Sequence, residues 1–485
     1  MKPNFATFKK LAGGRGGHSL VPTYEEIPCD TETPVTLYAK ISEGAEASQL
    51  LESVEGGESF ARYSFISASH HTQFSCSKSS QDPLGELKNI FARLNPAALS
   101  GLPRFCGGAV GHITYDMVRN FEKLPQRLSS DPSIPDALFF FTDECVVFDH
   151  WKHTLFLIKW NLIQKKDASS LSKVYRQSEQ SLVALRAKMS VAQTLRPLAP
   201  VGTESFANSM KSNLSSAQFQ SRVVKAKEYI RSGDVIQTVL SQRFETETNA
   251  SDFDLYRALR RVNPSPYLFL LHNKDFSIVG SSPELLVRKD GDAAMTCPIA
   301  GTRKRGANER EDLALEKELL ADPKERAEHI MLVDLGRNDL GRCCQPGSVK
   351  VSELMKIERY SHVMHIASTV EGKLKKGEDA FSLFKACFPA GTVTGAPKIR
   401  SMEIIEELED MRRGVYAGAV GYFSYSGNMD MAITIRTLLL KGKKLLVQAG
   451  AGIVADSDPL REEQETRSKA AALFKAAEIA ELGIK

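Results

Sequence analysis

The fold class is decided by three apolar segments near the end of the chain: Val415-Tyr-Ala-Gly-Ala-Val-Gly-Tyr-Phe-Ser424, Met429-Asp-Met-Ala-Ile-Thr-Ile-Arg-Thr-Leu-Leu-Leu440 and Lys444-Leu-Leu-Val-Gln-Ala449. Residues typical of strands dominate each segment, and short breaks separate them, so we expect three strands. Further strand signals occur at Val235–Phe244, Tyr267–His272 and Ser277–Gly280. Helical patterns lie between them, at Arg310–Leu320, Pro323–Leu335, Ala380–Cys387 and Pro397–Asp410. This mixture of strands and helices indicates an α+β fold.

The first part of the chain has its own pattern. Alternating apolar residues at Phe139–Phe148 and similar segments predict a predominantly antiparallel sheet flanked by helices. Between Asp167 and Ser216 the chain becomes polar, with a predicted helix at Leu171–Met189 followed by prolines and a glycine. We therefore expect two domains, at residues 1–200 and 201–485.

Composition excludes several classes of protein. The 485 residues carry 63 Lys and Arg against 59 Asp and Glu, a net charge of +4, with no long basic run and only two Trp, so nucleic-acid binding is not expected. Eight cysteines without a CxxC motif favour free thiols in a reducing cytoplasm. No apolar run is long enough for a transmembrane helix, so no membrane association is expected.

Two helix openings of the form Asp-Pro, at 322 and 458, each precede a pair of glutamates with the same spacing: Glu325 with Glu328, and Glu462 with Glu465. Residues three apart share one face of a helix, so each pair presents two carboxylates together. Carboxylate oxygens are ligands that Mg²⁺ prefers. Two plainer interpretations remain open, because Glu325 can complete a capping box and the second pair can be a solvated charged face.

Five phrases occur in one order in the second half: Gly280-Ser-Ser-Pro-Glu284, Pro298-Ile-Ala-Gly-Thr-Arg303, Glu328-His-Ile-Met-Leu-Val-Asp-Leu-Gly-Arg-Asn-Asp339, Phe388-Pro-Ala-Gly-Thr-Val-Thr-Gly-Ala-Pro-Lys398 and Gln448-Ala-Gly-Ala-Gly-Ile-Val-Ala-Asp-Ser457. Together they resemble the chorismate-utilising enzymes, over roughly residues 218–475. The resemblance implies large antiparallel sheets packed in a sandwich, with helices on the outside. It also implies a magnesium-dependent lyase that acts on chorismate.

The resemblance assigns roles to particular residues. Glu328 and Glu465 are the expected Mg²⁺ ligands, with Glu325 and Glu462 beside them. A divalent ion there would hold the ring carboxylate of chorismate. The second carboxylate needs a cationic partner, and Arg436 is the expected one. The full expected set of substrate contacts is Gln237, Thr302, Thr392, Tyr422, Arg436, Gly450, Ala451 and Gly452.

Two residues are expected to move protons. The ring hydroxyl leaves slowly unless it is protonated, so a carboxylic acid with a raised pKa should stand near it, and the resemblance points to Glu284. The resemblance also implies that His365 lies beside the ring and assists proton removal and pyruvate loss. On the residues alone, His365 alternates with apolar neighbours, a pattern that a core histidine also fits.

Two departures indicate the branch of the family. Isochorismate and salicylate synthases use a lysine to activate water where this chain has Gln237, and many aminodeoxychorismate synthases carry a lysine where this chain has Ala300. By resemblance, ammonia is then the incoming group, which implies the anthranilate-forming members and the first committed step of tryptophan biosynthesis. An aminodeoxychorismate synthase subunit remains the alternative. No cysteine lies in a Gly-x-Cys-x-Gly phrase, so a separate glutamine amidotransferase subunit is expected, in a heterotetramer of two large and two small subunits.

A second small-molecule site is also implied. Leu50-Leu-Glu-Ser53 and Asn263-Pro-Ser-Pro-Tyr-Leu268 resemble the feedback site for L-tryptophan in the anthranilate-forming members, although Leu268 stands where methionine is common. The expected tryptophan contacts are Glu52, Ser53, Pro264, Ser265, Pro266 and Tyr267. The plainer interpretation of these two segments is a helix cap and a turn at the interface between the two expected domains. A non-catalytic, tryptophan-sensing subunit is a further alternative for the whole chain.

Overall fold

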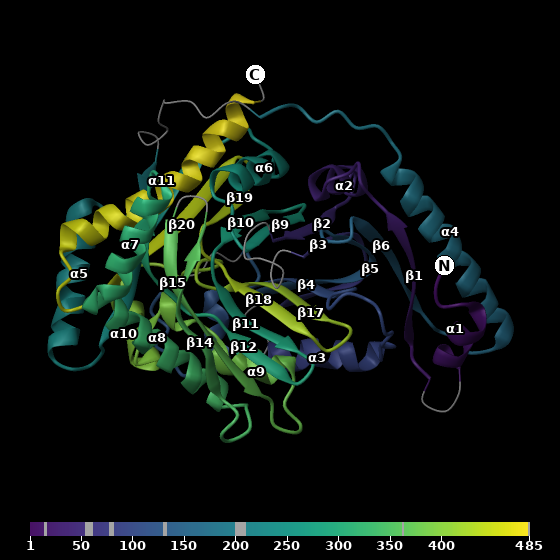
Figure 1. Cartoon of the computed structure of the whole chain (residues 1–485), viewed down its shortest axis with the longest axis horizontal. Coiled ribbons are helices and arrows are strands. Elements are labelled where there is room, and N and C mark those ends of the chain that lie inside the picture. The colour runs from purple at the N-terminus through teal and green to yellow at the C-terminus, as the bar shows by residue number, and fades with distance from the viewer. Residues whose placement is uncertain are drawn as a thin grey trace.

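The computed structural model describes residues 1–13, 17–53, 62–76, 82–129, 133–198, 210–360 and 363–483 (Figure 1). The part before residue 200 contains helices α1 (Phe5–Ala12), α2 (Pro34–Ile41), α3 (Pro83–Leu94) and α4 (Ala168–Met189), the 3-10 helix η1 (Tyr115–Asn120), and strands β1 (Leu20–Pro28), β2 (Ala47–Glu52), β3 (Tyr63–Cys76), β4 (Gly108–Ile113), β5 (Ala137–Asp149) and β6 (Thr154–Leu162). The later helices are α5 (Ser216–Arg231), α6 (Asp252–Val262), α7 (Glu309–Ala321), α8 (Pro323–Gly341), α9 (Ala380–Cys387), the 3-10 helix η3 (Gly391–Val393), α10 (Lys398–Leu408) and α11 (Pro459–Leu482). The later strands are β7 (Lys211–Ser212), β8 (Gln237–Glu247), β9 (Tyr267–Asn273), β10 (Ser277–Ser282), β11 (Leu285–Asp290), β12 (Ala293–Thr296), β13 (Ile299–Lys304), β14 (Lys350–Arg359), β15 (Val363–Lys373), β16 (Gly395–Ala396), β17 (Ala419–Ser424), β18 (Met429–Ile433), β19 (Thr437–Lys441) and β20 (Lys444–Ile453).

The strands form two antiparallel arms that meet at β5. Strand β5 pairs with β3 on one edge and with β4 and β6 on the other. One arm continues from β3 through β2, β9, β10, β19 and β20 to β8. The other continues from β4 through β17, β18, β11 and β12 to β15, which also pairs with β13 and β14. Pairing of β2 with β9 and of β4 with β17 joins the two halves of the chain, and the expected division at residue 200 stays a prediction.

The two arms pack against each other as a sandwich. Along β9, Phe269 enters a core cluster that also contains Met431 from β18 of the other arm, whereas Leu270 points to the opposite face. There it packs with Tyr256 of α6 and Phe474 of α11. This alternation has the period of two that places one face of a strand in the core and the other beneath helices. The expected α+β sandwich with outer helices is therefore confirmed.

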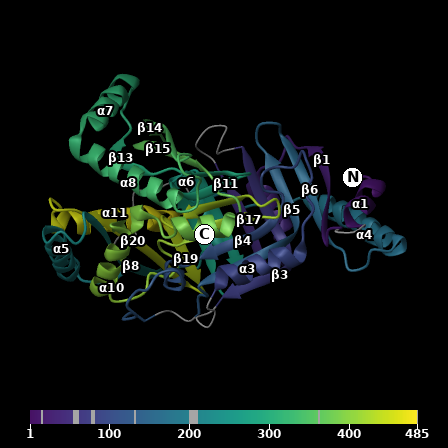
Figure 2. The same cartoon turned by 90° about the horizontal axis from the view of Figure 1, so that it is seen from below.

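The helices lie at the two ends and on the outer faces of the sandwich. In both views α1 and α4 lie at the end opposite to α5, α7 and α10 (Figures 1 and 2). The predicted helix at Leu171–Met189 is part of α4. Among the described helices, none combines the length and apolar character needed to cross a bilayer. All eight cysteines are free thiols, as expected.

The structure corrects the predicted strand at Met429–Leu440. It is two strands, because β18 ends at Ile433 and β19 begins at Thr437. Arg436, in the break, has a φ of +51°, a left-handed conformation that interrupts a ladder. β18 pairs within one arm and β19 within the other, so the chain passes from one arm to the other at this point. The crossover carries the arginine that was expected to bind substrate.

Candidate active site

Several elements bring the expected residues to one region of the sandwich. Strands β8, β13, β15 and β20 supply six of the positions, the β10–β11 turn and η3 supply two more, and the first two turns of α8 and of α11 supply the carboxylates. The Asp-Pro openings explain where these two helices begin. Asp322 Oδ1 accepts the backbone N–H of Lys324 and of Glu325 at 3.0 and 3.3 Å, and Asp458 Oδ1 accepts that of Arg461 at 2.9 Å.

Glu284 has the environment of a general acid. Its side chain is 7% exposed and lines a small cavity that it shares with Thr392 and with the apolar side chains of Leu332 and Leu335. Burial raises the pKa of Glu284 to about 8, and the nearby Thr392 hydroxyl offsets part of this rise. A protonated carboxyl and a hydroxyl therefore face one cavity at neutral pH.

His365 is held as a neutral imidazole. It lies opposite Thr302 in the β13–β15 pairing, and its Nδ1 is 2.9 Å from the Gly301 carbonyl oxygen. A carbonyl only accepts hydrogen bonds, so Nδ1 carries the proton and Nε2 keeps a lone pair. Burial lowers the pKa of His365, and the cationic Arg436 lowers it further, although the Gly301 carbonyl partly opposes the change. His365 is therefore available as a base near neutral pH.

Arg436 lies near Tyr416, which is not among the substrate contacts expected from the sequence. A Cβ added to Gly450 would lie 2.5 Å from the Tyr416 hydroxyl, so the glycine makes room for that group. Burial raises the pKa of Tyr416 to about 12, while nearby Arg436 lowers it. Burial lowers the pKa of Arg436, which Glu465 and Tyr416 partly offset, and no ion pair to Arg436 occurs among the described residues. A guanidinium without an ion pair in the described residues, near a tyrosine hydroxyl, is suited to a carboxylate.

Tyr422, which was expected at this end of the substrate, lies elsewhere. It lines a different cavity, where its ring centre is 4.2 Å from that of Phe105. Tyr416 and Tyr422 are six residues apart in the same apolar stretch, and only the first is near Gly450. The glycines at 414 and 418 flank Tyr416 and are the sequence signal of a turn rather than a strand.

Gln237 connects the glycine segment to the carboxylates. A Cβ on Gly452 would lie 2.4 Å from Gln237 Nε2, and this amide donates a hydrogen bond to Glu328 Oε1 at 3.2 Å. Gln237 Oε1 is buried and has no hydrogen-bond partner in the described ranges. Ala451 points the other way, into a core cluster with Leu240, so it can offer only its backbone to a ligand.

The four glutamates form an interacting acidic group. Burial raises the pKa of Glu328, and the carboxylates of Glu325 and Glu465 raise it further against the effect of Gln237. Burial likewise raises the pKa of Glu462, with a further contribution from Glu465. Glu325 also pairs with Arg303 at 3.0 Å instead of completing a capping box. These effects identify a site of concentrated negative charge.

The donor set fits a hard divalent cation in chemistry. It consists of carboxylate oxygens together with the unpaired amide oxygen of Gln237, and Mg²⁺ prefers oxygen donors. No group of three or more His, Cys, Asp or Glu side chains in the described residues is already arranged around a single ion. Lys469 pairs with Glu465 at 2.6 Å and donates to the Gly450 carbonyl at 2.9 Å. Rotation of exposed Glu465 is therefore needed before it can bind a metal.

The second cavity contains most of the expected tryptophan contacts. Its lining includes Glu52, Ser53, Pro266, Tyr267 and Leu268, together with Tyr422. Pro264 and Ser265 are not part of that lining, although Ser265 is buried nearby in sequence. The Glu52 carboxylate accepts hydrogen bonds from Tyr256 and, at 3.2 Å, from Arg260. An amino acid's ammonium group would share Glu52 with these two residues.

The sequence and structure define a chorismate-utilising fold with a buried carboxyl, a buried histidine, an arginine and an oxygen-rich acidic group. A profile of the chorismate binding enzymes matches residues 46–475, and this chain belongs to that family. Anthranilate synthase component 1 of Acetivibrio thermocellus is 46% identical over 95% of this chain and 96% of its own length. The protein of the same name from Aquifex aeolicus is 45% identical, with 96% of each chain covered. The crystal structure of anthranilate synthase component I from Streptococcus pneumoniae matches with a TM-score of 0.74 and 39% identity, over 87% of this chain and 93% of that one.

Proposed function

We propose that this chain is the large subunit of an anthranilate synthase. It converts chorismate and ammonia to anthranilate, pyruvate and water, the first committed step of tryptophan biosynthesis. The buried Glu284 carboxyl, with a pKa of about 8, carries the proposal because it can protonate the departing ring hydroxyl. The names and 45–46% identities of the relatives support this reaction over aminodeoxychorismate synthesis or a purely sensing role.

The remaining side chains account for the other steps. The ring hydroxyl takes a proton from Glu284 and leaves as water, while ammonia adds next to the ring carboxylate and then loses a proton. The ring C–H bond then breaks, the enolpyruvyl methylene gains a proton, and the C–O bond breaks to release pyruvate and anthranilate. His365 is suited to this second proton transfer because its Nε2 keeps a lone pair. Arg436 and Tyr416 are suited to the enolpyruvyl carboxylate.

Magnesium is part of the proposal. Glu328 and Glu465 would hold the ion, Glu325 and Glu462 would lie beside it, and Gln237 would orient Glu328. Mg²⁺ bound there would fix the ring carboxylate of chorismate and stabilise negative charge. The carboxylates support this role because they raise one another's pKa, a repulsion that a cation relieves.

A partner and an inhibitor are also proposed. The name "component 1" of the relatives implies a second component, and this chain has no Gly-x-Cys-x-Gly phrase for a glutaminase nucleophile. We infer a glutamine amidotransferase subunit that supplies ammonia, in a heterotetramer of two large and two small chains. L-Tryptophan would bind in the cavity around Glu52 and Tyr267 and inhibit by favouring a less active arrangement.

The test is an assay of the purified chain with chorismate, MgCl₂ and an ammonium salt, with products separated by chromatography. Anthranilate and pyruvate in equal amounts, formed without glutamine and abolished by a chelator, are expected. Accumulation of 4-amino-4-deoxychorismate or isochorismate would contradict the proposal. Addition of tryptophan should lower the rate, whereas an unchanged rate with bound tryptophan would contradict the feedback role alone.

A further inference from the structure

The segment between α10 and β17 carries Tyr416 into the candidate active site, and the N-terminal half of the chain holds this segment from outside. We propose that Asp116 is a positioning residue that fixes Tyr416 through its hydrogen bond to Gly414. Asp116 lies in η1 and is 4% exposed. The inference rests on the proposed function, because it assigns Tyr416 to the binding of the substrate carboxylate.

Two backbone contacts clamp the segment at Gly414. The Gly414 N–H donates to Asp116 Oδ2 at 2.9 Å, and the Gly414 carbonyl accepts the backbone N–H of Tyr115 at 2.8 Å. The Arg413 guanidinium lies over the ring of Tyr115, at 4.9 Å from its centre, and over that of Tyr416 at 5.6 Å. The backbone N–H and carbonyl of Gly414, two residues before Tyr416, are therefore both bonded to successive residues of η1.

The conformation of the segment explains why it needs an external clamp. Gly414 has a φ of +59° and Ala417 has a φ of +61°, so Tyr416 stands in a tight turn with a left-handed residue on each side. Alanine is strained in that conformation, which persists only where surrounding structure enforces it. The far end is held by Thr434, whose carbonyl accepts from Ala417 N and whose N–H donates to Gly418 O, both at 2.9 Å. Asp116 supplies the side-chain clamp at the near end.

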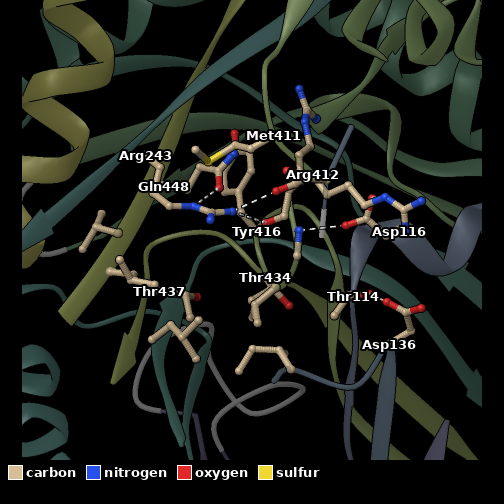
Figure 3. Close-up of a pocket in the computed structure, with 18 residues that line it drawn as sticks. Thr114, Asp116, Asp136, Arg243, Met411, Arg412, Tyr416, Thr434, Thr437 and Gln448 are labelled. Atoms are coloured by element: carbon tan, nitrogen blue, oxygen red, sulfur yellow. Dashed lines mark hydrogen bonds and ion pairs between the residues drawn. The ribbon is translucent and has the colours of Figure 1, made fainter. Parts of the chain in front are cut away.

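The electrostatic setting of Asp116 suits this task. Arg119 and Arg412 lie 3.7 and 4.0 Å from Asp116 Oδ1, too far for close hydrogen bonds. Burial raises the pKa of Asp116, and the Gly414 N–H and these two arginines partly offset the rise. Oδ1 is buried and has no hydrogen-bond partner among the described residues. Asp116 and Tyr416 line the same cavity (Figure 3). Oδ2 alone therefore makes the structural contact. The same cavity wall contains Asp136, which bonds the Thr114 hydroxyl at 3.1 Å and does not touch the Gly414 segment by any hydrogen bond in the described ranges.

Loss of the Asp116–Gly414 hydrogen bond would reach the substrate site through the Tyr416 hydroxyl. A displacement of Gly414 moves a ring whose hydroxyl fits against Gly450 so closely that a single added carbon there would collide at 2.5 Å. Arg436 lies near Tyr416, whereas Tyr422 of β17 lines the other cavity. Loss of the clamp should therefore weaken substrate binding more than it slows the chemical steps.

The test is a double-mutant cycle in the ammonia-dependent reaction. Asp116→Ala should lower kcat/KM for chorismate by roughly 10- to 100-fold, mostly through KM, as expected for a small misplacement of a binding group. In a Tyr416→Phe background the same change should alter kcat/KM by no more than about twofold, because residues that act through one group are not additive. Asp116→Asn keeps an acceptor for Gly414 and should recover to within about threefold of the parent. Asp136→Asn is the matched control and should match the parent.

Three results would overturn the inference: the full loss from Asp116→Ala in the Tyr416→Phe background, equal losses from the alanine and asparagine variants, or an equal loss from Asp136→Asn. A lower melting temperature of Asp116→Ala in both backgrounds does not enter the cycle, because kcat/KM is compared between folded samples. Failure of the proposed function is a separate result, since the parent chain would then form no anthranilate. Chorismate Kd values from calorimetry would in that case replace kcat/KM in the same cycle.

Discussion

Replacement of Glu284 tests the assignment of the general acid most directly. Glutamine keeps the size of the side chain in its cavity and removes the ionisable proton. Glu284→Gln should lower kcat by roughly 100- to 10,000-fold, the usual contribution of a positioned acid. The remaining activity should lack the decline at alkaline pH that the parent shows, because no group of this kind is left to ionise.

The size of the pKa shift of Glu284 follows from its burial. A pKa of about 8, against the ordinary 4.5, corresponds to roughly 5 kcal/mol of preference for the protonated form. At pH 7 about ten protonated carboxyls are present for each ionised one, whereas a solvent-exposed glutamate would be almost entirely ionised. Activity should therefore fall as the pH rises through about 8, since the acid form is lost there.

The assay measures initial rates of anthranilate formation between pH 6 and 10, expressed per concentration of unprotonated ammonia. This normalisation removes the separate titration of the nucleophile.

Thr392→Val is the companion variant. Its hydroxyl lowers the pKa of Glu284, so its removal should move the alkaline limb to higher pH even if kcat also falls.

Thermal unfolding independently checks the direction of the pKa shift of Glu284. The folded pKa of Glu284 is raised, so the folded state binds more protons than the unfolded state between about pH 4.5 and 8, and stability falls as pH rises through that window. Glu284→Gln should consequently gain melting temperature over the parent above pH 8 and match it near pH 4. An unchanged alkaline limb together with a constant difference in melting temperature would refute a protonated Glu284.

Three further changes probe other parts of the structure. Gly452→Ala places a carbon 2.4 Å from an amide nitrogen and should raise KM for chorismate by at least about tenfold, whereas Gly341→Ala, with open space around it, should not; equal KM values would contradict the packing argument. Glu52→Gln should raise the tryptophan concentration needed for half-maximal inhibition by roughly tenfold relative to the parent, and an unchanged concentration would exclude Glu52 as a ligand. Glu409→Ala leaves Arg413 buried without its partner and should cost about 3–5 kcal/mol in urea unfolding; a loss below 1 kcal/mol would be inconsistent with the buried pair.

Local sequence patterns located much of the candidate site. Asp-Pro openings set the starts of α8 and α11, so the glutamates that follow had to share one face of each helix. The placement of Glu284 in a turn between strands also followed from local pattern. Its raised pKa did not, because burial depends on Leu332, Leu335 and other residues distant in sequence.

The sequence does not reveal that Tyr416 and Tyr422 line different cavities. Both tyrosines lie in one apolar stretch, and strand periodicity does not tell which of them faces a given ligand. Ala417, in a left-handed conformation, ends the regular alternation before β17 begins. Tyr416 consequently faces Gly450, whereas Tyr422 is in the strand and lines the other cavity.

By itself, the sequence determined the α+β class, the helix starts that carry the acidic pairs, and the family to which the chain belongs, because each depends on residues close together in the chain. Only the tertiary structure decided that Met429–Leu440 is divided between the two arms of the sandwich and that Arg436 lies where the chain crosses between them. It also decided that Asp116 of the first half hydrogen-bonds Gly414 at the turn around Tyr416. Those features depend on contacts between segments up to about 300 residues apart, as in the Asp116–Gly414 bond with a separation of 298. Local propensity contains no information about such contacts, since packing and burial are properties of the whole folded chain.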